Sequence, residues 1–305
     1  MSSQTEIESP IPADLPDRQR TSAASVTKDD APASCAVNVG NVVFGDGRLS
    51  IIAGPCVVES REHTLRMARA CREAASACGL DFVFKASFDK ANRTSHQSFR
   101  GIGFEEALDV LREVKATYGV PCVTDVHDAR QVERVAEVVD MLQIPAFLCR
   151  QTDLLVEAAR TGLAVNVKKG QFLAPEDARN IVLKLRDAGC ERILLTERGT
   201  TFGYHNLIVD MRSFAVMRAN NVPVVFDVTH SLQQPGALGN ATGGQPEFIE
   251  PLARAGVAAG ADAVFMEVHD DPAHALSDGA NALPLKRFQP LLESLFRVHQ
   301  AISIS

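Results

Sequence analysis

Short apolar runs alternate with longer amphipathic stretches along most of the chain. Many of these runs are rich in valine and isoleucine, and continuous apolar runs of this length are typical of parallel strands buried on both faces. The pattern therefore predicts eight buried strands. They cover residues 49–53, 82–85, 122–125, 140–144, 164–168, 192–197, 224–227 and 263–267.

Stretches with helical periodicity separate the predicted strands. The clearest helices cover residues 60–78, 104–118, 175–188 and 248–259. Several open on Ser, Pro or Glu and are followed by Gly, as helix caps require. Strands that alternate with helices predict an α/β fold, and eight such units without a Gly-rich dinucleotide turn favour a TIM (β/α)8 barrel over a doubly wound sheet.

The N-terminal part of the chain differs from the rest. Residues 1–35 are rich in Ser, Pro, Asp, Glu and Arg and contain few large apolar residues, which predicts a disordered tail. Apolar residues at 37–39 and 42–44, a Gly-Asp-Gly turn at 45–47 and the apolar run that follows predict a short β-hairpin leading into the first strand. We therefore expect two parts, a tail at 1–35 and a barrel domain at 36–305.

Composition and charge narrow the function. The chain has 305 residues, 46% of them hydrophobic, and a formal net charge of -7, which argues against a nucleic-acid-binding surface. Seven cysteines without paired spacing favour a reducing compartment. Because no apolar run reaches the roughly 20 residues of a membrane helix and no signal peptide is recognisable, we expect a cytoplasmic protein without a membrane partner.

Polar residues stand where the predicted strands end. In a barrel the C-terminal ends of the strands carry the active site. Any one of these residues alone could be a strand-end residue with a structural role, but all eight strands carry at least one. They are Cys56, Lys85, Asp125, His127, Gln143, Lys168, Glu197, Arg198, Asp227, His230, Glu267 and His269.

Cations are prominent among these strand-end residues. Lys85, Lys90, Lys168 and Arg198 would meet at one end of the barrel. Ammonium and guanidinium groups pair with phosphate and carboxylate oxygens. In an acidic protein such a local cluster predicts phosphorylated acids as ligands.

A second set at the same end could bind a metal ion. It comprises one thiol, one imidazole and two carboxylates, at Cys56, His230, Glu267 and Asp278. Mixed soft and hard ligands suit Zn(II), Fe(II) or Mn(II) better than Mg(II). A lone Cys or His is more often a packing residue than a ligand, so only the placement at converging strand ends favours the metal site.

Long stretches of the chain resemble the 3-deoxy-D-manno-octulosonate 8-phosphate synthases. The segment KASFDKANRTS at residues 85–95 looks like the signature of that family, and the resemblance covers roughly residues 49–300. Further matching segments lie at residues 124–127, 143–148, 150–153, 166–169, 198–199, 202–204 and 226–230.

The resemblance implies a reaction between phosphoenolpyruvate and arabinose 5-phosphate. C3 of phosphoenolpyruvate attacks the sugar aldehyde, water adds to C2, and phosphate leaves by C–O cleavage. The family also implies a homotetramer, in which the sugar-binding segment reaches a neighbouring subunit's site. The substrate-binding residues implied are Lys85, Ser87, Lys90, Asn92, Arg93, Thr94, Ser95, Gln143, Ala146, Lys168 and Arg198. The catalytic residues implied are Lys90, Asn92, Asp125 and His127.

The same resemblance points to the metal-dependent branch of the family. Metal-independent members have Asn where this chain has Cys56, and Cys-Asp-Gly-Pro where it has Ser-Asp-Gly-Ala at residues 277–280. A divalent transition metal (Fe, Zn, Mn or Co) held by Cys56, His230, Glu267 and Asp278 is implied. Ala280 departs from the proline of that motif.

Two alternative functions stay open. A 3-deoxy-D-arabino-heptulosonate 7-phosphate synthase shares the barrel and phosphoenolpyruvate but uses a shorter acceptor, and resembles Lys-Pro-Arg-Thr where this chain has Lys-Ala-Asn-Arg at residues 90–93. A barrel that binds ligands without catalysis is the other alternative. The full set of candidate ligands and phosphate-binding cations argues against it.

Overall fold

The computed structural model describes residues 36–93, 95–234 and 243–303. The tail predicted at residues 1–35 lies outside the described residues, and so does Thr94. The described residues belong to one compact unit, Pro32–Ser305.

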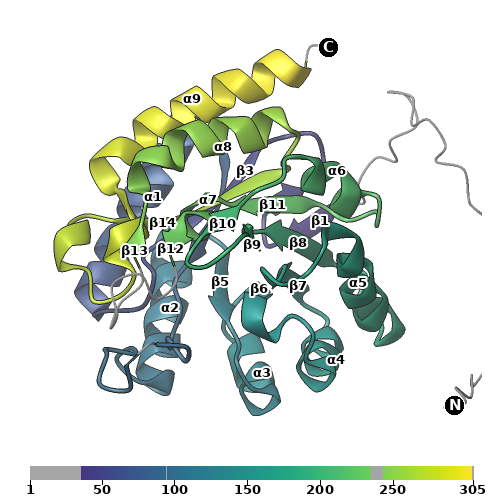
Figure 1. Cartoon of the computed structure of the whole chain (residues 1–305). Helices are drawn as coiled ribbons and strands as arrows, with labels where there is room; N and C mark the ends of the chain where they lie inside the picture. The colour runs from purple at the N-terminus through teal and green to yellow at the C-terminus, as the bar shows by residue number, and fades with distance from the viewer. Residues whose placement is uncertain (1–35, 94, 235–242, 304–305) are drawn as a thin grey trace, which may run out of the picture. The chain divides into compact units, whose positions relative to one another are not determined.

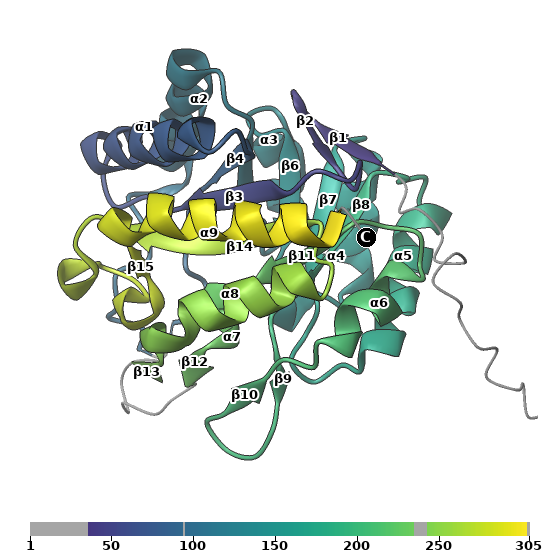
Figure 2. The same cartoon turned by 90° about the horizontal axis from the view of Figure 1, so that it is seen from above.

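Within the described ranges, eight parallel strands form a closed barrel. Each strand pairs with the next along the chain, and the pairing of the first and last strands closes the ring, with Ser50 opposite Ala263. These two strands, β3 and β14, lie side by side in both views (Figures 1 and 2). The predicted (β/α)8 barrel is confirmed. Its strands are β3(Ser50–Gly54), β4(Asp81–Lys85), β5(Cys122–Asp125), β6(Met141–Ile144), β7(Ala164–Lys168), β8(Ile193–Glu197), β11(Val224–Asp227) and β14(Ala263–His269).

Helices cover the outside of the barrel, as Figure 1 shows. They are α1(Arg61–Ala77), α2(Phe104–Tyr118), α3(Ala129–Ala136), α4(Thr152–Arg160), α5(Ala178–Asp187), α6(Arg212–Arg218), α8(Ile249–Ala258) and α9(Leu285–Ser303). The Ser60 side chain caps α1 by accepting the N–H of His63, and Gly119 ends α2 with a left-handed φ of 64°. All four predicted helices are confirmed, although the first turn of the third is a 3-10 helix, η2(Pro175–Asp177).

Alternating residues of the strands contribute to two separate apolar cores. Ile51 packs in the cluster that includes the helices, whereas Ile52 belongs to a second cluster built from the inward-facing strand residues. The predicted hairpin, β1(Val37–Val39) and β2(Val42–Phe44), is confirmed and belongs to this inner cluster. It therefore fills the N-terminal end of the barrel with apolar side chains.

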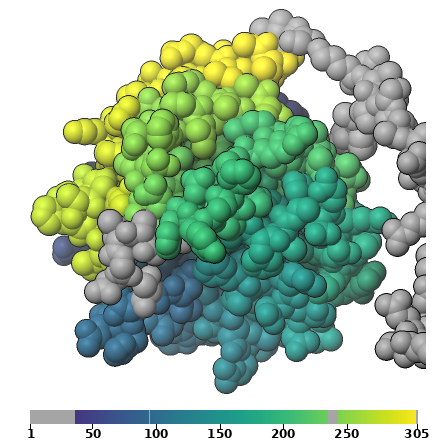
Figure 3. Space-filling view, viewed as in Figure 1, coloured from purple at the N-terminus to yellow at the C-terminus, as the bar shows by residue number. Residues whose placement is uncertain are grey.

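Longer loops gather at the opposite end. They carry the hairpins β9(Thr200–Thr201)–β10(Leu207–Ile208) and β12(Gln233–Gln234)–β13(Gly243–Gly244), which lie at the other end of the barrel from β1 and β2 (Figure 2). The short helix α7(Val228–Ser231) follows β11, and the short strand β15(Leu283–Pro284) pairs with β14. In the space-filling view, the green residues around β9 and β10 lie near the centre of the face seen in Figure 1 (Figure 3). No helix in the described ranges has the length and apolar character needed to cross a bilayer.

Candidate active site

A pocket of about 300 Å³ opens at the C-terminal ends of the barrel strands. It brings together many of the residues that the sequence singled out. Predicted site residues that line it are Lys85, Lys90, Asn92, Asp125, His127, Ala146, Lys168, Arg198, His230 and Asp278.

The two-residue period of the strands explains why these side chains face inward. Val83 lies in the inner apolar cluster, so Lys85, two positions later on β4, points into the same space. The same spacing leads from Val123 to Asp125 on β5. Along these two strands, the inward-facing side chains thus change from apolar to charged within two residues.

Asp125 is the centre of a buried hydrogen-bond network. Its carboxylate accepts hydrogen bonds from Ser87 Oγ and, at 2.8 Å, from Gln143 Nε2, and it lies 3.8 Å from Lys85 Nζ. Burial alone would raise the pKa of Asp125, but the charges of the neighbouring lysines hold it well below its usual range. Ser87 and Gln143 do not line the pocket but hold the Asp125 carboxylate, and their predicted contacts with substrate stay predictions.

Two cations at the ends of β7 and β8 differ in their partners. Lys168 Nζ lies 2.5 Å from Asp227 Oδ2, yet burial lowers its pKa in spite of that partner. Arg198 donates from Nη2 to Gln233 Oε1 at 2.7 Å, and its buried Nη1 has no hydrogen-bond partner among the described residues. Burial also lowers the pKa of Arg198. An anion bound here would offset the cost of burying both charges.

The cations on β4 and in the loop after it share a buried carboxylate of β14. Lys85 Nζ donates to Glu267 Oε1 at 3.1 Å, and Lys90 Nζ lies 3.5 Å from the same oxygen. Burial lowers the pKa of Lys90, but the carboxylates of Glu267, Asp125 and Asp278 favour its charged form, and the pKa lies well above the usual value. Glu267 is therefore the counter-ion of both lysines.

Three of the four predicted metal ligands form one group. One ligand atom from each of Cys56, Glu267 and Asp278 lies within 4.8 Å of the others. Cys56 Sγ lies 3.1 Å from Ser277 Oγ and 3.5 Å from Asp278 Oδ2, so its single S–H can donate to either. Burial raises the pKa of this thiol, so a cation beside it would be needed to favour the thiolate.

His230, the fourth predicted ligand, borders this group through Glu267. Its Nδ1 lies 2.7 Å from Asp227 Oδ2, which leaves Nε2 directed at Glu267 Oε1, 3.5 Å away. A carboxylate behind a histidine is the usual orientation device at metal sites. The buried Glu267 Oε2 has no hydrogen-bond partner in the described part of the chain. The donor set therefore fits a divalent transition metal.

The described residues that were predicted to bind the sugar and its phosphate do not all line the pocket. Asn92 lines the pocket, but Arg93 donates to Ser277 Oγ at 2.7 Å and lies 3.8 Å from Asp278 Oδ1. Ser95 Oγ accepts from the N–H of Gln97 at 3.3 Å, and Thr94 lies outside the described residues. The sugar-binding roles of Arg93, Thr94 and Ser95 stay predictions.

Some pocket residues were missed by the sequence prediction. Gln171 and Gln233 line the pocket from loops after β7 and β11, and glutamine carries no charge signal that would single it out. Glu197, noted at a strand end, faces the other side of its strand and lies 3.6 Å from the buried Lys169. Because successive side chains of a strand point to opposite faces, the sequence could have placed Glu197 and Arg198 on different faces.

Comparisons with known proteins agree with this geometry. Three similar proteins carry the name 2-dehydro-3-deoxyphosphooctonate aldolase. The one from Trichlorobacter lovleyi is 56% identical over 85% of this chain and 96% of its own length. The Fusobacterium nucleatum protein is 54% identical (87% and 96%), and the Koribacter versatilis protein 56% identical (87% and 96%). The DAHP synthetase I family matches residues 24–302, and the chain belongs to this family.

Proposed function

We propose that this chain condenses phosphoenolpyruvate with D-arabinose 5-phosphate and water to give 3-deoxy-D-manno-octulosonate 8-phosphate and phosphate. The observation that carries the proposal is the buried Arg198, whose Nη1 has no hydrogen-bond partner among the described residues, beside Lys168 in a pocket that borders a thiol–carboxylate group. A substrate with phosphate and carboxylate groups suits these cations. The name shared by the similar proteins supports the same activity.

The chemistry joins C3 of phosphoenolpyruvate to the sugar's aldehyde carbon, while water adds to C2 and the C2–O bond to phosphate breaks. Lys168 and Arg198 would hold the anionic groups of phosphoenolpyruvate. Burial lowers the pKa of His127, and Asp125 restores it only in part. A neutral His127 imidazole could therefore accept a proton during the addition of water. The ionised Asp125 would stabilise positive charge on the neighbouring lysines.

A divalent transition metal is part of this proposal. Cys56, His230, Glu267 and Asp278 would hold it, and when bound it would act as a Lewis acid toward the sugar aldehyde or a water molecule. A thiolate ligand makes Fe, Zn, Mn or Co more suitable than Mg.

Two further expectations belong to the same proposal. The homotetramer and the cytoplasmic location stay predictions, and size-exclusion chromatography with light scattering tests the first. We also propose that the product, an octulosonate phosphate, is used in the synthesis of lipopolysaccharide-type sugars.

The decisive experiment compares two aldose phosphates. The family's description names the heptulosonate synthases, so erythrose 4-phosphate is the natural competitor. We expect kcat/KM for arabinose 5-phosphate to be far higher, because residues 90–93 resemble the octulosonate enzymes. Equal or reversed values would contradict the proposal. Stabilisation by phosphoenolpyruvate without turnover of either sugar would favour the binding protein instead.

A further inference from the structure

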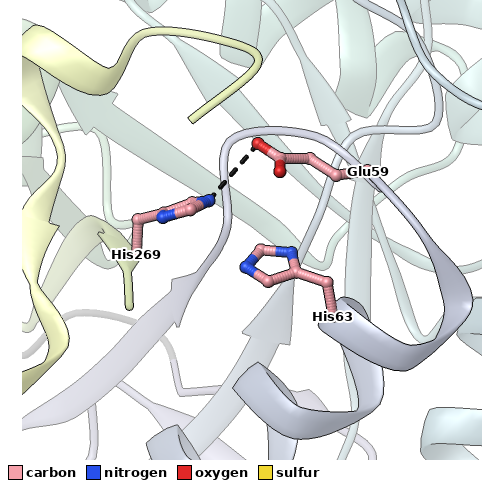
Figure 4. Close-up of side chains that lie close together, drawn as sticks. All are labelled: Glu59, His63 and His269. Atoms are coloured by element: carbon pink, nitrogen blue, oxygen red, sulfur yellow. Dashed lines mark ion pairs between the residues drawn. The ribbon is translucent and has the colours of Figure 1, made fainter. Parts of the chain in front are cut away.

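A second group of metal-binding side chains lies outside the pocket. Glu59 precedes α1, His63 lies in the first turn of α1, and His269 ends β14. One ligand atom from each lies within 4.8 Å of the other two, and Figure 4 shows the three side chains converging. None of the three lines the active-site pocket.

The two imidazoles are buried and incompletely bonded. The side chains of His63 and His269 are 9% and 7% exposed, and that of Glu59 is 12% exposed. His63 Nδ1 has no hydrogen-bond partner among the described residues, and His269 Nε2 makes no well-formed hydrogen bond, with only the Glu59 carboxylate 3.3 Å away. Buried polar atoms are normally bonded, so these two nitrogens beside one carboxylate point to a further partner.

Asp270 occupies the position behind both rings. Its Oδ1 lies 3.0 Å from His63 Nε2 and 3.3 Å from His269 Nδ1, while Arg66 donates to its Oδ2 at 2.7 Å. A carboxylate that accepts the outer N–H of a histidine leaves the other nitrogen as a lone-pair donor. Asp270 can do this for both rings at once.

One contact opposes metal binding and has to be outweighed. The Asp271 N–H donates to His269 Nδ1 at 2.9 Å, which places the ring proton on Nε2, 3.3 Å from Glu59 Oε1. Binding of an ion at Nε2 moves this proton to Nδ1, where Asp270 can accept it. The change gives up one hydrogen bond and gains a coordination bond from each of three side chains.

We propose that Glu59, His63 and His269 bind a second divalent transition metal, separate from the one near Cys56. Two imidazoles and one carboxylate suit Zn(II) or Co(II), with water completing the coordination. Glu59 Oε1 also accepts the N–H of Leu276 at 2.8 Å. The ion would therefore tie the start of α1 and the end of β14 to the segment that leads to Asp278.

Metal stoichiometry tests the proposal without relying on activity. The chelator-stripped full chain is titrated with Co(II), desalted and analysed for metal, while absorption spectra report thiolate-to-cobalt charge transfer. We expect two Co(II) per chain, with charge transfer from Cys56 alone. His63→Gln and His269→Gln should each bind one Co(II) and keep the charge-transfer band. Cys56→Ala should lose the band but keep cobalt d–d bands from the second site.

Matched controls separate coordination from general effects. Glu62→Gln removes an exposed carboxylate next to His63, and His299→Gln removes an imidazole on α9, so both should keep two Co(II) per chain. Circular dichroism of each stripped variant checks folding, and Glu59→Gln provides a second route to the same loss. One Co(II) in the wild type that both folded histidine variants retain, or two in both of these variants, would overturn the proposal.

Discussion

The two halves of the barrel interior are built from the same strands but have opposite chemistry. At the N-terminal half, Val83 packs in a wholly apolar cluster that the β1–β2 hairpin completes. Two residues later on the same strand, Lys85 is equally buried but carries an ammonium group among carboxylates. The difference separates a region that stabilises the fold from one that is arranged for binding.

The physical reason is the cost of burying charge. Apolar burial contributes roughly 25 cal/mol per Å² of area removed from water. Buried ions lose solvation that their mutual attraction only partly returns, so replacing a whole ion pair with apolar residues is often neutral or stabilising, whereas removing one partner strands the other charge. Substitutions in the C-terminal half that leave no charge stranded should therefore affect activity far more than stability, and substitutions in the N-terminal half should do the opposite.

The largest effect is expected at Cys56. Chelation, or Cys56→Ala, should abolish turnover because the thiolate is lost from the metal site, while the melting temperature of the apo chain changes little. Mn(II), Co(II) or Fe(II) should restore the chelated wild type, and Mg(II) should do so poorly. Cys56→Asn, which copies the metal-independent branch, should keep some turnover with chelator present. Full activity with no metal detectable would contradict the assignment.

The next largest effect concerns the apolar half. Phe44→Ala should lower the free energy of unfolding by about 3–5 kcal/mol, because the side chain is fully buried in the inner cluster. KM for both substrates should stay unchanged below the melting temperature. Denaturant unfolding gives the first quantity and steady-state kinetics the second. Phe248→Ala, at a residue 44% exposed, is the control and should cost far less.

The same contrast explains which features of the structure could be predicted from the sequence. Strands and helices were predictable because apolar periodicity is a local property, and each predicted strand matches an observed one. The pocket cations Lys85 and Lys168 were predictable because the ends of barrel strands converge. The placement of Arg93 against Ser277 was not, since it depends on how two distant loops pack.

The direction of individual side chains is the other feature that was not predicted from the sequence. Glu197 stands at a strand end like Arg198, but its alternation turns it toward Lys169. His269 was noted only as a strand-end residue, because its neighbours Glu59 and His63 come from a segment more than two hundred residues earlier. Such clusters become visible only when the closure of β3 against β14 is known.

A smaller effect is expected for the two cations at the ends of β7 and β8. Arg198→Ala and Lys168→Ala should each raise KM for phosphoenolpyruvate roughly 10- to 150-fold, because a lost charged hydrogen bond costs about 1.5–3 kcal/mol. Arg198→Ala should lower the melting temperature little, because no carboxylate is left without its partner. Lys168→Ala should lower it more, because the buried Asp227 then keeps only His230 as a counter-ion. Arg212→Ala, an exposed arginine with an 87% exposed side chain, is the control. Normal phosphoenolpyruvate affinity in both variants would refute the anion site.

The smallest effect is expected at Arg93, which belongs to the predicted sugar-binding segment but lies next to the predicted metal ligand Asp278. Its guanidinium already donates to Ser277 Oγ, so binding a sugar phosphate would exchange one partner for another. We therefore expect Arg93→Ala to raise KM for arabinose 5-phosphate only about fivefold, a net loss near 1 kcal/mol. KM for phosphoenolpyruvate should stay unchanged.

The same variant decides which side of the pocket Arg93 serves. Arg93 lies 3.8 Å from Asp278 Oδ1, so it could instead position a metal ligand. In that case Arg93→Ala would change the affinity for Co(II) and leave KM for the sugar phosphate as it is. Arg93→Lys keeps the charge but loses the paired N–H geometry, and should recover sugar binding in part if phosphate is the partner. Measuring both KM values and the Co(II) affinity on the two variants therefore separates a phosphate-binding role from a metal-positioning one.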